Sequence, residues 1–67
     1  MVEITINGAP RQIPMPLNMM QLLEQMQLGG KRVAIERNGE IVPRSRYAHV
    51  ELAQGDQIEI VVAVGGG

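Results

Sequence analysis

The sequence contains no cysteine, tryptophan or phenylalanine, and its one aromatic residue is Tyr47. Without cysteine the chain can form neither a disulfide bond nor a thiolate metal site, so apolar burial must stabilise the fold by itself. No apolar run approaches the ~20 residues of a membrane-spanning helix, and the N-terminal residues lack the pattern of a secretory signal. These absences predict a cytoplasmic protein.

The sequence also has no large excess of positive or negative charge, because six basic and seven acidic residues give a net charge of −1. The basic residues are spread along the chain and interleaved with acids: Arg11, Lys31, Arg32, Arg37, Arg44 and Arg46. Nucleic-acid binders usually have a concentrated basic face and aromatic side chains that stack on bases. The sequence therefore argues against a nucleic acid as the partner.

The length of 67 residues allows one small domain. Because 45% of the residues are hydrophobic, nearly every apolar side chain is needed for the core. A small-molecule pocket, typically ~300–1,000 Å³, is hard to fit into such a chain. The composition therefore disfavours a stand-alone enzyme.

Alternating apolar and polar residues predict five short strands. The first is followed by Asn7-Gly8, a strong hairpin signal because both residues tolerate positive φ. Pro10 cannot donate to a ladder, so we expect the return strand to start after it. The expected strands are residues 2–6, 11–13, 33–36, 41–42 and 57–64.

One helix is expected from Met19 to Leu28. Asn18 can cap its start, with Gln21 completing a capping box. Apolar residues recur at helical spacing and form one stripe, namely Met19, Leu22, Leu23 and Met26. Gly29-Gly30 should end the helix, because a glycine readily adopts the left-handed cap.

One helix with one apolar stripe covers one face of one sheet. A helical connection after the first hairpin favours a last strand that lies parallel to the first, in the centre of the sheet. The order of elements therefore predicts an α+β roll, in which a mixed sheet of four to five strands has one helix packed across it. In the last strand, Ile58, Ile60 and Val62 should face the core.

Val61 and Ala63 should then lie on the opposite face of the sheet, which no expected helix covers. An apolar patch on a polar surface often marks a partner site. Two small apolar residues are equally compatible with the scattered apolar exposure of ordinary protein surfaces. Val61 and Ala63 are the candidate partner surface.

Ser45, His49 and Asp56 are the only serine, histidine and aspartate, so they are the one candidate for a hydrolytic triad. No glycine-flanked turn surrounds Ser45, and the small core leaves no room for a cleft. Zinc takes three or four ligands, and this chain offers one histidine. We expect surface polar residues, with neither a catalytic residue nor a bound metal.

The sequence ends in Val64 followed by Gly65-Gly66-Gly67. Glycines add nothing to packing there, so we expect a folded domain of residues 1–64 and a flexible tail of residues 65–67. The tail could be a frayed end or an expression scar. It could also be narrow enough for a partner's tunnel, with the Gly67 carboxylate as the reactive group once ATP has converted it to an adenylate.

The chain resembles the ubiquitin-like β-grasp sulfur carriers, and within them the carriers of thiamine biosynthesis. The resemblance covers the full length and is most specific in the second half. The stretches that carry it are Val33-Ala34, Glu36, Asn38-Gly39, residues 41–45, Gly55-Asp56, residues 58–60 and residues 64–67. The chain departs from the family pattern in having three terminal glycines instead of two, and in Tyr47 where a tryptophan is common.

The resemblance implies a β-grasp fold and a protein co-substrate with no catalytic residue of its own. An adenylyltransferase of the ThiF type would activate the Gly67 carboxylate and consume ATP, while Gly65 and Gly66 would be recognised along the tail. Sulfur from a persulfide donor would then produce a thiocarboxylate, from which a thiazole synthase of the ThiG type takes the sulfur. No cofactor would be bound by the carrier.

Two alternatives stay open at this point. The small subunit of molybdopterin synthase shares the fold, the glycine end and the sulfur chemistry, but it is usually longer. A ubiquitin-like tag would instead join Gly67 to a lysine through an amide bond. The fate of Gly67 distinguishes the tag from both sulfur carriers.

Overall fold

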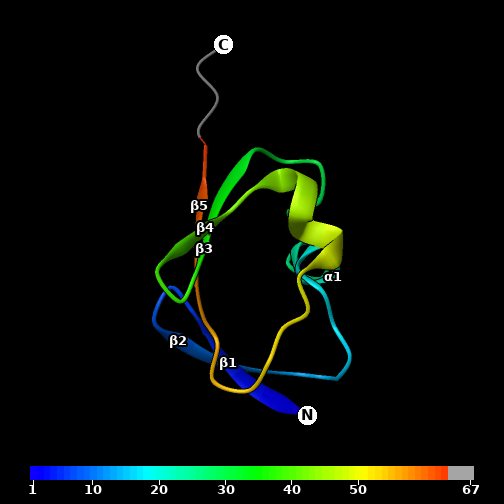
Figure 1. Cartoon of the computed structure of the whole chain (residues 1–67), viewed down its shortest axis with the longest axis vertical. Coiled ribbons are helices and arrows are strands. Elements are labelled where there is room, and N and C mark those ends of the chain that lie inside the picture. Colours follow the sequence, from blue (N-terminus) through cyan, green and yellow to red (C-terminus); the bar gives the residue numbers. More distant parts are fainter. Residues whose placement is uncertain (64–67) are drawn as a thin grey trace.

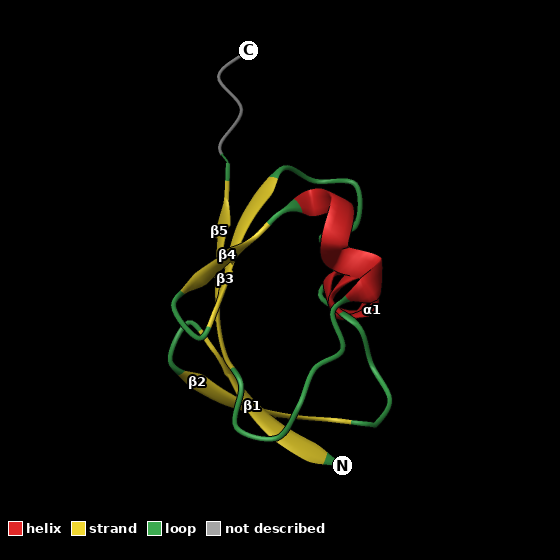
Figure 2. Cartoon of the chain, viewed as in Figure 1, coloured by secondary structure: helices red, strands yellow, loops and turns green. Residues whose placement is uncertain are grey.

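The computed structural model describes residues 1–63 as one mixed sheet with one α-helix on one side of it (Figures 1 and 2). Across the sheet the strands follow the order β2-β1-β5-β3-β4. The elements are β1 (Val2–Ile6), β2 (Ala9–Ile13), α1 (Met19–Gln25), β3 (Val33–Arg37), β4 (Glu40–Val42), the 3-10 helix η1 (Arg44–His49) and β5 (Gln57–Val62). The expected α+β roll is confirmed, and its sheet has five strands.

The last strand occupies the centre of the sheet, as the sequence predicts. β5 pairs in parallel with β1 and antiparallel with β3. Its first residue, Gln57, lies opposite Thr5, and its last residue, Val62, lies opposite Val33. β5 therefore leads from the interior of the sheet to the end of the described chain (Figure 1).

The first hairpin turns at Asn7 and Gly8, whose φ angles of 52° and 84° are the left-handed pair that a two-residue turn favours. The return strand begins at Ala9, so the prediction that it starts after Pro10 is wrong. Pro10 lies opposite Thr5, one position beyond the pair that closes the turn. At that position of an antiparallel ladder the backbone N–H points away from the partner strand, and because β2 is an edge strand the proline removes no ladder bond.

The start of α1 follows the sequence closely. The side chain of Asn18 accepts a hydrogen bond from the backbone N–H of Gln21 at 2.8 Å, and the Gln21 side chain accepts one from the backbone N–H of Asn18 at 2.9 Å. This is the expected capping box. The apolar stripe is also confirmed for Met19, Leu22 and Leu23, which are buried. Its fourth member, Met26, is the C-cap and is partly buried against the core.

The end of α1 lies earlier than the sequence predicts, at Gln25 instead of Leu28. The left-handed residue that follows is Gln27, with φ of 60°, and not a glycine. The backbone N–H of Gln27 donates to Glu24 and that of Leu28 donates to Leu23, the two bonds of a Schellman motif. Leu28, which follows this cap, is partly buried against the core, a contact that favours the end of the helix at this position.

The core lies between the sheet and α1, and η1 adds its one aromatic side chain to it. Its buried members are Ile4, Ile6, Ile13, Leu17, Met19, Leu22, Leu23, Ile35, Val42, Tyr47, Leu52, Ile58 and Ile60. Val62, which was expected in this core, is 41% exposed. It stands on the core-facing side of β5, but the last buried residue of this strand is Ile60. The expected boundary between a domain of residues 1–64 and a tail of residues 65–67 lies outside the described residues.

Candidate functional site

β5 has neighbours on both sides over its first half and on one side over its second half. Its parallel pairing with β1 ends at Ile58, and the side chain of Asn7 bonds both the N–H and the carbonyl of Ile60 at 2.8 and 3.1 Å. From Val61 onward, the described part of the chain pairs β5 with β3 alone. The alternation of the ladder turns the N–H and carbonyl of Val62 to the side that β1 no longer covers.

Val61 and Ala63 occupy the surface that the sequence predicts for them. Val61 lies opposite Ala34 in the ladder and is 64% exposed. Ala63 is exposed too, and its backbone N–H donates to the carbonyl of Arg32 at 2.9 Å. Together with exposed Ala34, these residues form an apolar surface on the sheet face that α1 leaves open.

A hollow of about 310 Å³ lies beside this apolar surface. We call it the tail-end hollow, because it adjoins Ala63, the last described residue. Its lining residues are Lys31, Arg32, Val33, Ala34, Arg44, Tyr47, Val61 and Ala63. Three of them are basic and none is acidic. Lys31 and Arg32 come from the segment before β3, and Arg44 comes from the start of η1.

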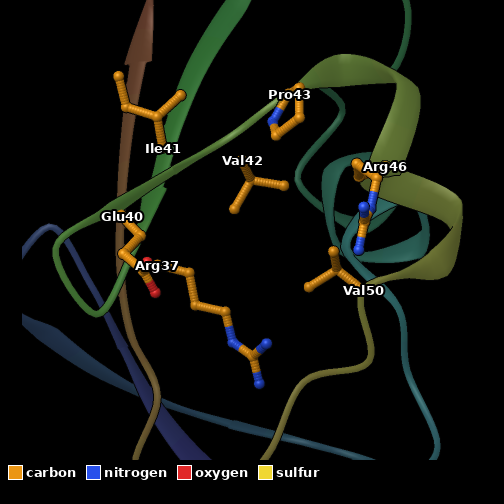
Figure 3. Close-up of a pocket in the computed structure, with 7 residues that line it drawn as sticks. All are labelled: Arg37, Glu40, Ile41, Val42, Pro43, Arg46 and Val50. Carbon is orange, nitrogen blue, oxygen red and sulfur yellow. The ribbon is translucent and has the colours of Figure 1, made fainter.

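A second hollow, of about 290 Å³, lies between β4 and the end of η1. Figure 3 shows the side chains of Val42 and Val50 turned toward one another across it. Its charged residues have both signs, and one of them, Arg37, is bonded elsewhere: Nε donates to Asp56 at 3.0 Å and Nη2 to the carbonyl of Glu51 at 3.1 Å. This hollow offers a partner less free charge than the tail-end hollow does.

The structure does not support a triad of Ser45, His49 and Asp56, because the Asp56 carboxylate is bonded to other residues. Ser45 and His49 are exposed on η1, as the sequence predicts. Asp56 was expected on the surface, but it is buried, with 5% of its area exposed. Its two carboxylate oxygens accept hydrogen bonds from Arg37, Asn38 and the backbone N–H of Ala53 at 2.9–3.1 Å. A carboxylate that is bound in this way stabilises the turn before β5 and is not available to orient a histidine.

Residues 1–63 contain no group of three or more histidine, cysteine, aspartate or glutamate side chains placed to hold a metal ion. Within the same range, no helix is both long and apolar enough to cross a membrane. The predicted site residues Gly65, Gly66 and Gly67 lie outside the described residues. The described site is therefore the surface that leads to them.

The cluster of Lys31, Arg32 and Arg44 was not predicted from the sequence. The first two are neighbours in the sequence, but Arg44 follows only after a complete hairpin. The one available signal was the Asn38-Gly39 turn, whose φ angles of 52° and 86° close that hairpin. The turn folds β4 back along β3, and η1 then begins near the start of β3. That turn and the lengths of the two strands together predict that Arg44 lies close to Arg32.

Several known proteins are similar in sequence to this chain. The model of the ThiS family matches residues 4–67. The chain is 54% identical over 46 residues to the sulfur carrier protein ThiS of Bacillus subtilis, which covers 69% of this chain and 70% of that protein. It is 41% identical over 66 residues to a thiazole synthase of Paramagnetospirillum magneticum. That match covers 98% of this chain but 20% of the synthase, so the chain spans about a fifth of the length of this relative.

A solved structure agrees with the fold over nearly the whole chain. The crystal structure of a thiamine biosynthesis protein (ThiS) from Geobacter metallireducens superimposes with a TM-score of 0.83 at 29% sequence identity. The alignment covers 98% of this chain and 100% of that one. The two proteins therefore share the same fold.

Proposed function

The chain belongs to the ThiS family, and on this premise we propose that it is a sulfur carrier of thiamine biosynthesis that works through the carboxylate of Gly67. One observation carries the proposal: the family match runs to residue 67 and so includes the three glycines. The open end of β5 supports it, because the strand leads to these glycines along a surface that the rest of the described chain leaves uncovered.

The chemistry explains why a carrier needs an activating enzyme. A carboxylate is a poor electrophile, so ATP would first transfer AMP to the Gly67 carboxylate and release pyrophosphate. The terminal sulfur of a persulfide would then attack the carbonyl carbon and expel AMP. A thiol would cleave the resulting S–S bond, taking the other sulfur into a disulfide and leaving the thiocarboxylate on Gly67. The partner enzymes supply every catalytic group for these reaction steps, and this chain is the co-substrate.

We infer two partner enzymes. The first is a ThiF-type adenylyltransferase, which would consume the ATP, so that the carrier itself needs no bound cofactor. The second is a ThiG-type thiazole synthase, which would accept the sulfur. The thiazole synthase relative supports the second partner, because a segment similar to this chain makes up a fifth of that protein. The persulfide donor stays an expectation from the family resemblance, and the cytoplasmic location stays a prediction from the sequence.

Intact-mass spectrometry tests the proposal. The protein would be isolated from thiamine-starved cells that contain its own partner enzymes, beside a variant that lacks Gly67. We expect the full chain to gain the mass difference between sulfur and oxygen, and the variant to gain nothing. An unmodified full chain, with the partners present and active, would overturn the proposal. Adducts linked through lysine would identify a protein tag instead.

A further inference from the structure

The tail-end hollow concentrates positive charge in a chain whose net charge is −1. Lys31, Arg32 and Arg44 line it, all three are exposed, and no acidic residue is among its lining. Within residues 1–63 the one ion pair joins Arg37 to Asp56, so these three cations have no ionic partner there. Like charges that are gathered without a partner repel one another, and a ligand of opposite charge relieves this repulsion.

The apolar part of the hollow narrows the choice of ligand. Ala34, Val61 and Ala63 line the hollow together with the cations, and they lie on the open face of the sheet. An apolar surface with a charged rim matches the composition of protein–protein interfaces. Single-stranded nucleic acids are usually bound with the help of stacking aromatic side chains, and the chain's one aromatic residue, Tyr47, is buried. A protein segment that carries carboxylates beside apolar side chains complements both features.

Chain length brings the enzymes that act on Gly67 close to this hollow, and the adenylyltransferase is the first of them in the proposed reaction. Four residues follow Ala63, and a chain spans at most ~3.3–3.6 Å per residue, so Gly67 lies within about 14 Å of Ala63. Any enzyme that encloses the carboxylate of Gly67 must therefore bring its own surface to the end of β5. Lys31 and Arg44 border that end, and lysine and arginine side chains are long enough to contact a surface placed there.

We propose that the tail-end hollow docks an acidic segment of the adenylyltransferase, which carries carboxylates at the mouth of the site that receives Gly67. This inference rests on the proposed function and specifies how the partner is recognised. The cations set the approach of the enzyme and speed its association, while Val61 and Ala63 provide the apolar contact. Because charges at an interface rim act mainly on association, the binding should weaken steeply with salt.

Charge reversal tests the proposal with the purified adenylyltransferase as the probe and ATP left out, so that binding is measured apart from chemistry. Lys31→Glu combined with Arg44→Glu should raise the Kd about tenfold or more at low salt and flatten its salt dependence. The neutral pair Lys31→Gln and Arg44→Gln should give an intermediate Kd. Thermal unfolding of each variant shows that it is folded.

The matched control reverses two other exposed cations, Arg11→Glu and Arg46→Glu, which changes the net charge by the same amount. Its Kd should stay within about twofold of wild type. An equal loss in both double variants would overturn the proposal in favour of general charge attraction. An unchanged Kd in the Lys31 and Arg44 variant would overturn it outright.

Two further outcomes keep this inference apart from the proposed function. If wild type gains sulfur while the Lys31 and Arg44 variant binds as wild type does, the docking site fails and the sulfur carrier stands. If wild type neither binds the enzyme nor gains sulfur, both fail. Inorganic phosphate serves as a second probe: saturable chemical-shift changes at Lys31 and Arg44, without any effect of the variants on enzyme binding, would show an anion site instead.

Discussion

The two ends of β5 lie in opposite surroundings. At its start, Asp56 is buried and bonded to Arg37, Asn38 and Ala53, and the backbone of Gln57 is bonded to Asn38. At its other end, Val61 is exposed and the basic residues of the tail-end hollow have no ionic partner within residues 1–63.

This difference indicates which residues of the molecule stabilise the fold and which are available to bind a partner. Polar groups that are bonded within the chain hold the fold together, because removing one partner leaves a buried donor or acceptor unsatisfied. Polar groups without such bonds contribute little to the fold and are free to bind another molecule. Changes at the start of β5 should therefore alter stability, and changes at the tail end should alter partner binding and sulfur loading.

The largest expected effect is on chemistry alone. Deleting Gly67 should abolish thiocarboxylate formation completely, because the activated carboxylate would then sit on a shortened tail. Adding one residue after Gly67 should do the same, since it moves the carboxylate. Mass spectrometry measures the loading, and thermal unfolding should give the wild-type Tm for both variants. A fall in Tm as large as that of a core mutant would contradict the different roles of the two ends, because it would show that the tail end also stabilises the fold.

Asp56→Ala should produce the largest loss of stability at the start of β5, by about 2–3 kcal/mol, because three donors lose their shared acceptor. Asp56→Asn keeps one acceptor oxygen and should give an unfolding free energy between those of wild type and the alanine variant. Urea unfolding measures both. Molecules that stay folded should still be loaded with sulfur, and a specific loss of loading would show that the two ends are coupled.

Asn7→Ala should cost about 1–2 kcal/mol, because Asn7 bonds both backbone groups of Ile60 and holds a φ of 52°. Asn7→Gly removes the same two bonds but suits the left-handed conformation. The difference between the two variants in urea unfolding therefore isolates the conformational part. Equal values would show that the backbone angle contributes nothing.

Val61→Asp should have the smallest effect on folding, within about 0.5 kcal/mol, because the side chain is exposed. It should still weaken binding of the adenylyltransferase several-fold by placing an acid in the apolar contact. Gln12→Asp is the matched control, since it adds the same charge to an exposed position on β2. Equal affinities for the two variants, measured by calorimetry, would remove Val61 from the partner surface.

Local signals in the sequence were sufficient for most of the framework. Asn7-Gly8 and Asn38-Gly39 set their turns through positive φ, and Asn18 with Gln21 set the start of α1. The end of α1 was mispredicted, because the left-handed cap is Gln27 and not a glycine, and partly buried Leu28 follows it against the core. The strand after the first turn was mispredicted because a proline is acceptable only on an edge, and the position of a strand in the sheet is not a local property.

The candidate site divides in the same way. The sequence by itself pointed to Gly67 and to Val61 and Ala63 on the open face, since strand alternation decides which side chains share a face. It showed six basic residues spread along the chain, and it placed Asp56 on the surface. Only the tertiary structure gathered Lys31, Arg32 and Arg44 at one hollow and buried Asp56 among its donors. Periodicity and turn chemistry act over a few residues and are written in the sequence, whereas the neighbours of a charge are set by strand pairing between residues far apart in the chain.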